Sequence, residues 1–378
     1  MLLTLMSTAF AISMFVGVLT IRYAHLRNPD GMHEDMIGVQ KFHVAPTPRI
    51  GGVPIMAGLC AGMIAWWSSG RPNLSLFVLL LVCAAPVFLA GLAEDITRRV
   101  SPAKRLFAAF MSAGLGIWLL GAQLPSLGIP LLDDWLLQWP VLAVMLTVFA
   151  VGGVCHSINI IDGYNGLMAG VAILVGLAFA YVALIVGDRF ILKASLLLVA
   201  ALVGFMVWNF PRGLIFAGDA GAYLVGFMLA ELAVLLVVRH PGVVSPWFPF
   251  LVLIYPVFET VFTIYRRKQR KAAAGLPDSM HFHQIIYKRL MRWMVGDREA
   301  KQLLKRNSMT SPYLWCVALM TVLPAVFFWQ YESVLQGFCV LFVGGYVWLY
   351  RRIVRFRSPR WLVYRKVVST RTPSLSKR

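Results

Sequence analysis

Four carboxylates in this 378-residue chain lie at the ends of long apolar segments, where an acidic group is costly unless it serves a site. They are Glu94 and Asp95 in GLAEDITRR, Asp162 in NIIDGYNG and Asp219 in FAGDAGAY. Each lies near a glycine, and glycine lets the backbone approach a ligand closely. If the helices bring these acids together, in a chain of net charge +19, they can hold a divalent metal and a phosphorylated substrate.

The composition indicates that these residues are positioned by membrane-spanning helices. The chain is 59% hydrophobic and 13% charged, whereas a soluble domain carries roughly 25% charged residues. Because a helix crosses the hydrocarbon core in about 20 apolar residues, we predict an all-α polytopic integral membrane protein with about eleven transmembrane helices. The apolar runs are 2–21, 50–68, 75–93, 106–121, 139–155, 166–186, 190–208, 220–238, 247–264, 312–329 and 334–350. They do not alternate as the strands of a membrane β-barrel would.

Lysine and arginine predict the orientation of these helices. With the N-terminus outside and the C-terminus inside, 31 of the 35 Lys and Arg residues lie on the cytoplasmic side. The predicted membrane domain covers 1–350 and a basic cytoplasmic tail covers 351–378. The cytoplasmic loops are 22–49, 94–105, 156–165, 209–219 and 265–311, and all four carboxylates fall on that side. The net charge is therefore explained by topology and by the lipid bilayer as partner, and we expect no nucleic acid.

Each acidic motif also has a plainer explanation. Glu94 and Asp95 can bind Mg²⁺ or act as a base, or be neutralised by the cations that follow them. Asn159 and Asp162 would share a helical face, and Gly163 and Asn165 could meet the edge of a uracil ring, although a polar turn between helices would look similar. Asp219 opens a predicted span, where a simple helix cap would also be acidic.

Basic residues near these acids are candidates for phosphate contacts. Lys41 belongs to the segment KFHVAPTPRIGG and Lys104 follows the acid pair, although the positive-inside bias alone would place cations there. His281 and His283 form a His-x-His after a polybasic stretch and could bind pyrophosphate or a metal. None of the five cysteines has the spacing of a metal site.

Taken in order, these motifs resemble the polyprenyl-phosphate N-acetylhexosamine-1-phosphate transferase family. Its members include the phospho-MurNAc-pentapeptide translocase and the enzymes that initiate O-antigen synthesis. The resemblance runs from about residue 28 to residue 290. It rests on KFHVAPTPRIGG, the acid pair, NIIDGYNGL, GDAG and the histidine segment. The chain departs from the usual pattern at Glu94, where the family has Asp, at Ala222 for Ser and at Gln284 for His.

The resemblance implies a metal-dependent phosphoglycosyl transferase on the cytoplasmic face of a bacterial inner membrane. It would transfer HexNAc-1-phosphate, most often GlcNAc-1-phosphate, from a UDP-sugar donor to undecaprenyl phosphate and release UMP. It would thereby initiate a cell-surface polysaccharide such as O-antigen. Asp219 and Asn159 are the expected ligands of Mg²⁺, with Mn²⁺ as an alternative metal, and Asp162 lies near them. Asp95 is expected to orient or deprotonate the lipid phosphate, with Glu94 beside it.

The remaining expected site residues contact the donor and the lipid phosphate. Lys41, Lys104, His281 and His283 would meet phosphate or pyrophosphate, and Gly163 and Asn165 would meet uracil. A homodimer is compatible with the sequence.

Two other functions stay open from the sequence alone. A transporter or flippase of lipid- or nucleotide-linked sugars would place its site near the bilayer midplane, and Glu231 is the one acid predicted at that depth. A non-catalytic assembly subunit with a decayed site is the second alternative, because of Glu94 and Gln284.

Overall fold

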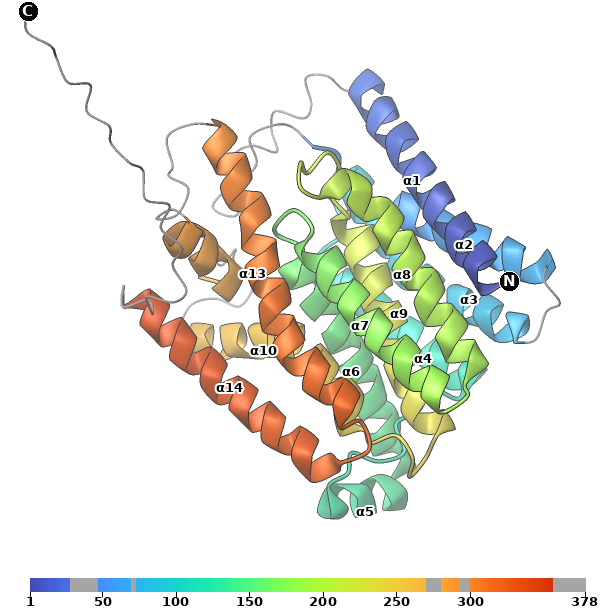
Figure 1. The fold of residues 1–378 in the computed structure, drawn as a ribbon. Helices are drawn as coiled ribbons and strands as arrows, with labels where there is room; N and C mark the ends of the chain where they lie inside the picture. The colour runs from blue at the N-terminus through green and yellow to red at the C-terminus, as the bar shows by residue number, and fades with distance from the viewer. Residues whose placement is uncertain (28–46, 69–72, 270–279, 292–299, 356–378) are drawn as a thin grey trace, which may run out of the picture.

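The computed structural model describes residues 1–27, 47–68, 73–269, 280–291 and 300–355 (Figure 1), which are mostly helical with no β-strand among them. Ten of the described helices are long and apolar enough to cross a membrane, and the 17-residue α2 (Gly52–Ser68) adds a shorter apolar helix. The ten are α1 (Leu2–Arg27), α3 (Leu74–Thr97), α4 (Pro102–Leu120), α6 (Pro140–Ile161), α7 (Leu167–Ile185), α8 (Arg189–Asn209), α9 (Gly218–Arg239), α10 (Trp247–Gln269), α13 (Ala300–Phe327) and α14 (Glu332–Val354). The predicted class, an all-α polytopic membrane protein, is confirmed.

Helix α9 forms the centre of the bundle. Nearly all of its residues are buried, and it packs against α2, α3, α4, α6, α7 and α8. By contrast, α1 and α14 lie at opposite edges of the bundle (Figure 1) and expose much of their apolar surface. A helix that is apolar on all sides belongs in the interior of a bundle, so the sequence of α9 is consistent with its central position.

Small residues let the first turns of α9 approach two neighbouring helices. A Cβ placed on Gly91 of α3 would lie 2.6 Å from the Cα of Ala220. A Cβ on Gly52 at the start of α2 would lie 2.5 Å from the backbone nitrogen of Gly221. Both distances are too short for any side chain, so glycine at these positions permits the start of α9 to contact α3 and α2 directly.

A short helix, α5 (Pro130–Gln138), lies within the segment 122–138 that separates two predicted spans. It immediately precedes α6, whose other end carries Asn159, so α5 lies at the end of the bundle away from the acidic motifs (Figure 1). Asp133 accepts hydrogen bonds from the backbone N–H groups of Leu127 and Ile129 and so fixes the turn that leads into this helix.

The segment 265–311, predicted as a cytoplasmic loop, is largely helical where the structure describes it. Helix α10 continues to Gln269, α11 (Phe282–Ile285) and the π-helix η2 (Ile286–Met291) follow, and α13 begins at Ala300. That this segment joins two spans on the cytoplasmic side stays a prediction, and the structure adds that most of its described part is helical. The early part of α13 is polar in sequence, yet α13 is held by packing against α7, α10 and η2.

Candidate active site

Asp95 joins the end of α3 to the start of α9. Its carboxylate accepts hydrogen bonds from the backbone N–H groups of Asp219 (2.8 Å) and Ala220 (2.9 Å). The first N–H groups of a helix lack partners within the helix and favour negative charge, so Asp95 caps α9 from a neighbouring helix. Gly218 has a φ of 68°, and a side chain there would collide with this carboxylate and with the carbonyl of Arg49.

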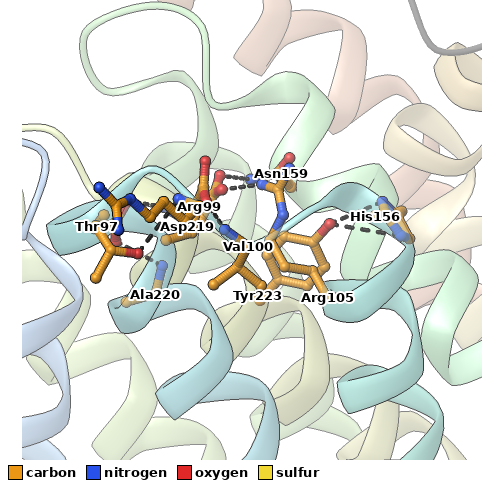
Figure 2. A network of polar contacts seen from close by, with 11 residues as sticks. Thr97, Arg99, Val100, Arg105, His156, Asn159, Asp219, Ala220 and Tyr223 are labelled. Carbon is orange, nitrogen blue, oxygen red and sulfur yellow. Dashed lines mark hydrogen bonds and ion pairs between the residues drawn. The ribbon is translucent and has the colours of Figure 1, made fainter.

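Asp219 is the centre of a second set of contacts, drawn in Figure 2. Its Oδ1 accepts a hydrogen bond from the Asn159 amide at 2.8 Å, and its Oδ2 forms an ion pair with Arg105. Asn159 comes from the last turn of α6, and Arg105 comes from the first turn of α4. The side chains of Arg105 and Asp219 remain partly accessible, with 14% and 18% of their surface exposed. A carboxylate is therefore held at the meeting point of three helices, within reach of a ligand.

A strip of extended chain, residues 48–52, lies across this end of the bundle. The Phe216 N–H donates to the carbonyl of Pro48 at 2.9 Å, and the N–H groups of Gly51 and Gly52 donate to the carbonyls of Phe216 and Ala217. These bonds place residues 48–52 alongside the segment that leads into α9. Arg49 is exposed and lies in this strip, next to the acidic cluster.

Asp162 lies in the turn after α6 and is half-buried. Burial raises the pKa of this carboxyl to about 7, and the positive charge of Arg49 opposes the rise. A carboxyl in this range can exchange a proton near neutral pH, or be held ionised when a cation comes close.

His283 lies against the same turn, and His281 stacks on His283. The rings of His281 and His283 are stacked, with centroids 5.2 Å apart and planes at 7°. The His283 ring meets the edge of Tyr164 with a centroid distance of 5.5 Å, and a Cβ on Gly163 would lie 3.5 Å from its Nε2. The structure thus brings the histidine segment to the Asp162–Gly163 turn.

Comparison with known proteins gives one family and a consistent set of relatives. Residues 77–237 match the model of glycosyl transferase family 4. A Bacillus subtilis protein described as a probable undecaprenyl-phosphate N-acetylglucosaminyl 1-phosphate transferase is 31% identical over 65% of this chain and 67% of its own length. The undecaprenyl-phosphate alpha-N-acetylglucosaminyl 1-phosphate transferase of Salmonella typhi is 25% identical over 75% of this chain and 77% of its own. A Mycobacterium leprae decaprenyl-phosphate N-acetylglucosaminephosphotransferase is 28% identical over 65% and 67%.

The chain belongs to glycosyl transferase family 4. The polyprenyl-phosphate HexNAc-1-phosphate transferase family inferred from the motifs is confirmed. The family 4 match contains Asp95, Asn159 and Asp219, which the structure brings into direct contact. It ends before the histidine segment, so the contacts between His283 and Tyr164 extend the site beyond the matched region.

Two further predicted residues, Glu94 and Lys104, make contacts within the turn that joins α3 to α4. Glu94 accepts a hydrogen bond from the backbone N–H of Val100 at 2.7 Å and so stabilises the turn after α3. Lys104 is exposed on the first turn of α4, where its backbone N–H is capped by Ser101. Lys41 lies outside the described residues.

Asn165 is turned into the protein. It is 1% exposed, its amide donates to the carbonyl of Pro211 at 2.9 Å, and its backbone N–H donates to the Asn307 side chain. Ser311 donates to its carbonyl. These contacts attach the turn after α6 to α13. Recognition of uracil by Asn165 stays a prediction, and this side chain would have to exchange its contact with Pro211 to meet a base.

Sequence reasoning missed a layer of residues beneath the acids. Tyr223 contacts His156 through its hydroxyl, which lies 2.9 Å from Nδ1, and Arg105 lies over the Tyr223 ring at 5.9 Å (Figure 2). Helical periodicity carries the signal that could have revealed them. Tyr223 is four residues after Asp219 and His156 is three before Asn159, so each shares a helical face with a site residue.

The donor set at Asp219 suits a hard cation that binds together with a substrate. Among the described residues, no group of three or more His, Cys, Asp or Glu could form a complete metal cage. Mg²⁺ does not need one, because it takes one or two protein ligands and completes its shell with water and substrate phosphates. The Asp219 carboxylate and the adjacent Asn159 amide provide such a pair, and the contact with Arg105 shows that this position accepts positive charge.

Proposed function

We propose that this multi-pass membrane protein transfers GlcNAc-1-phosphate from UDP-GlcNAc to undecaprenyl phosphate, with Mg²⁺ bound at Asp219 and Asn159. The observation that carries the proposal is the convergence of Asp95, Asn159, Arg105 and Asp219 on the first turn of α9. It is supported by the family and by the names of three relatives, which describe N-acetylglucosaminyl phosphate transfer to a polyprenyl phosphate.

In the proposed reaction, an oxygen of the lipid phosphate forms a bond to the β-phosphorus of the UDP-sugar. The bond from that phosphorus to the bridging oxygen breaks, and UMP leaves with the electron pair. The products are a lipid pyrophosphate sugar and UMP. The lipid phosphate is largely ionised at neutral pH because the second pKa of a phosphate monoester is near 6. Neutralising and positioning the two anionic substrates is therefore the main task of the protein.

Different residues would neutralise and position the two anionic substrates. Bound Mg²⁺ would neutralise phosphoryl charge in the transition state. Asp95 holds the start of α9 and so fixes the position of Asp219. The guanidinium of Arg105 offsets the charge of Asp219, and Arg49 supplies positive charge at the exposed rim of the cluster. His283 lies beside the Gly163 turn with His281 stacked on it, and both buried rings would have to become accessible to meet the pyrophosphate of the donor.

The orientation of the chain follows from its charges. Placing the acidic cluster on the cytoplasmic face gives the 31-to-4 distribution of Lys and Arg that the sequence shows. The N-terminus is then outside, the C-terminus is inside, and the cytoplasmic UDP-sugar reaches the cluster directly. The product would start a cell-surface polysaccharide such as O-antigen. The names of the relatives do not favour a transporter.

The test is release of UMP by the purified protein in detergent. Undecaprenyl phosphate, Mg²⁺ and a panel of UDP-HexNAc donors are supplied, with EDTA and omission of the lipid as controls. We expect UMP only when lipid and metal are both present, and most rapidly with UDP-GlcNAc. Release that is unaffected by EDTA would reject the metal at Asp219. Absence of UMP with every donor, from folded protein, would reject the transfer reaction.

A further inference from the structure

A buried carboxylate in α10 holds the histidine segment, Met280–Gln284, from beneath. Glu259 is 1% exposed. Its Oε1 accepts a hydrogen bond from the backbone N–H of Phe282 at 2.9 Å and lies 3.3 Å from Nδ1 of His281. Its Oε2 accepts a hydrogen bond from the Tyr346 hydroxyl of α14 at 2.7 Å. Two hydrogen bonds and a close contact with the His281 ring therefore fix the position of this carboxylate.

A second attachment lies about two turns further along α10. Arg266 donates to the carbonyl of Met280 and to the hydroxyl of Tyr350, both at 2.7 Å. The Tyr350 hydroxyl lies 3.1 Å from the same carbonyl. Phe262 packs between the rings of Tyr346 and Tyr350, with centroid distances of 5.6 and 4.8 Å. The start of the histidine segment is thus fixed by α10 and α14 together.

A carboxylate is a costly choice if its purpose is only to pack α10 against α14. Burying a charged group away from water costs several kcal/mol unless it is fully hydrogen-bonded, and apolar side chains would pack these helices without that cost. Glu259 recovers the cost through the N–H of Phe282, the ring of His281 and the hydroxyl of Tyr346. Two of these three contacts are made with the histidine segment, so the carboxylate fixes the position of that segment.

The histidine segment links Glu259 to the candidate site. His281 stacks on His283, and His283 lies over Gly163 and against Tyr164. A displacement of the backbone at Phe282 would move both imidazoles relative to the turn that bears Asp162. Tyr346, on the last helix of the described chain, contacts Glu259 through its hydroxyl and Phe282 of the histidine segment through its ring, with ring centroids 4.7 Å apart.

We propose that Glu259 and Tyr346 are positioning residues for the UDP-sugar, and that they act by holding His281 and His283 over the Gly163 turn. The inference rests on the proposed function, since it assigns the histidines to the donor's pyrophosphate. It gives α14 a role in binding the donor. It predicts that damage to this pair affects the donor and leaves the lipid substrate unaffected.

The test uses Tyr346→Phe, which removes one hydroxyl and keeps the ring packing. We expect KM for UDP-GlcNAc to rise about tenfold, because Glu259 loses a donor to a charged acceptor. KM for undecaprenyl phosphate and the melting temperature should stay near wild type. Glu259→Gln, which weakens every contact of the carboxylate, should raise the donor KM further. Tyr331→Phe is the matched control, because its ring is 59% exposed at the other end of α14, and it should behave as wild type.

A double-mutant cycle separates positioning from general stability. If Tyr346 acts through the histidines, adding Tyr346→Phe to His281→Ala should change the donor KM little beyond His281→Ala alone. If the two substitutions raise the donor KM independently, so that their effects multiply in the double variant, the inference is overturned. It would also be overturned by a loss of kcat that follows a loss of folded protein while the donor KM stays constant, or by a wild-type donor KM in both Tyr346→Phe and Glu259→Gln.

The binding of UDP, measured by calorimetry, distinguishes this inference from the proposed reaction. If wild-type protein releases no UMP but binds UDP, and Tyr346→Phe weakens that binding about tenfold, the transfer reaction fails and the positioning role stands. If wild-type protein turns over but UDP affinity is the same in both proteins, the reaction stands and the positioning role fails. If wild-type protein neither turns over nor binds UDP, both are rejected.

Discussion

Replacing Asp95 with asparagine would distinguish two roles that its position allows, which are positioning the start of α9 and acting as a base. The carboxylate accepts two backbone hydrogen bonds from the first turn of α9, at 2.8 and 2.9 Å. An asparagine side chain can accept only one of them with its oxygen, and its NH₂ group then faces the second N–H donor. The variant should therefore release part of the first turn of α9, and with it the Asp219 carboxylate.

The size of the effect follows from these two bonds. A hydrogen bond to a charged group contributes about 1.5–3 kcal/mol. Losing one such bond and weakening the other costs the active arrangement roughly 2 kcal/mol after relaxation, which corresponds to a fall of about 30-fold in kcat/KM. The concentration of Mg²⁺ that gives half-maximal activity should rise as well, because Asp219 is displaced. Asp134→Asn, an exposed acid on α5, is the matched control and should show neither change.

The pH dependence decides between positioning and base catalysis. UMP release is measured for wild type and Asp95→Asn at pH 5.5, where most lipid phosphate carries a proton, and at pH 8.5, where very little does. A positioning role predicts that the full defect persists at pH 8.5. If Asp95 deprotonates the lipid phosphate, the defect should be large at pH 5.5 and nearly absent at pH 8.5. That second pattern, with an unchanged requirement for Mg²⁺, would refute the positioning argument.

Three further variants test the other parts of the molecule. Asp219→Ala should abolish transfer while the protein still reaches the membrane and keeps its melting temperature within a few degrees; retained activity would reject the proposed metal ligand. Glu231 is fully buried with no hydrogen-bond partner for either carboxyl oxygen, so Glu231→Gln should leave transfer unchanged and stability equal or higher; a loss of transfer would give this residue a role in the reaction. Burial alone would raise the pKa of Asp188, but its hydrogen bonds with Arg239, the Ile191 N–H and His240 outweigh burial and hold that pKa below its usual range. A depressed pKa contributes stability above the unfolded value of about 3.9 and loses it as pH falls through the folded value. Wild type should therefore melt above Asp188→Asn at pH 6, with the difference closing below about pH 4; a constant difference from pH 3 to 6 would contradict this.

The fold was predictable from the sequence because apolar length is a strong signal in a membrane. Eleven predicted runs correspond to ten spanning helices and the shorter α2. Apolar length did not predict the helical segments that are too short or too polar to span a membrane. The nine residues of α5 are too few to span, and the polar start of α13 is helical because of its packing against α7 and η2. Such packing depends on distant segments that no local pattern reveals.

The candidate site was predictable as a set of residues and less so as a set of contacts. The convergence of Asp95, Asn159 and Asp219 on one end of the bundle followed from their positions at span ends. Which atoms meet could not be read from the sequence, because Asp95 and Asp219 are 124 residues apart. The same reason explains Asn165. Its side-chain amide suggested contact with a ligand, but that amide donates to the carbonyl of Pro211, 46 residues later.

The site consists of two parts that rest on different helices. The acidic part is built on the ends of α3, α4, α6 and α9, and its contacts lie within residues 95–220. The histidine part is built on α10 and α14 and is held by Glu259 and Arg266. The two parts meet at the Gly163–Tyr164 turn, where His283 lies. Substitutions in α10 or α14 can therefore shift the histidines while the contacts of Asp95 and Asp219 stay intact. Under the proposed function, this arrangement lets the affinity for the donor change without altering the residues to which the phosphoryl chemistry is assigned.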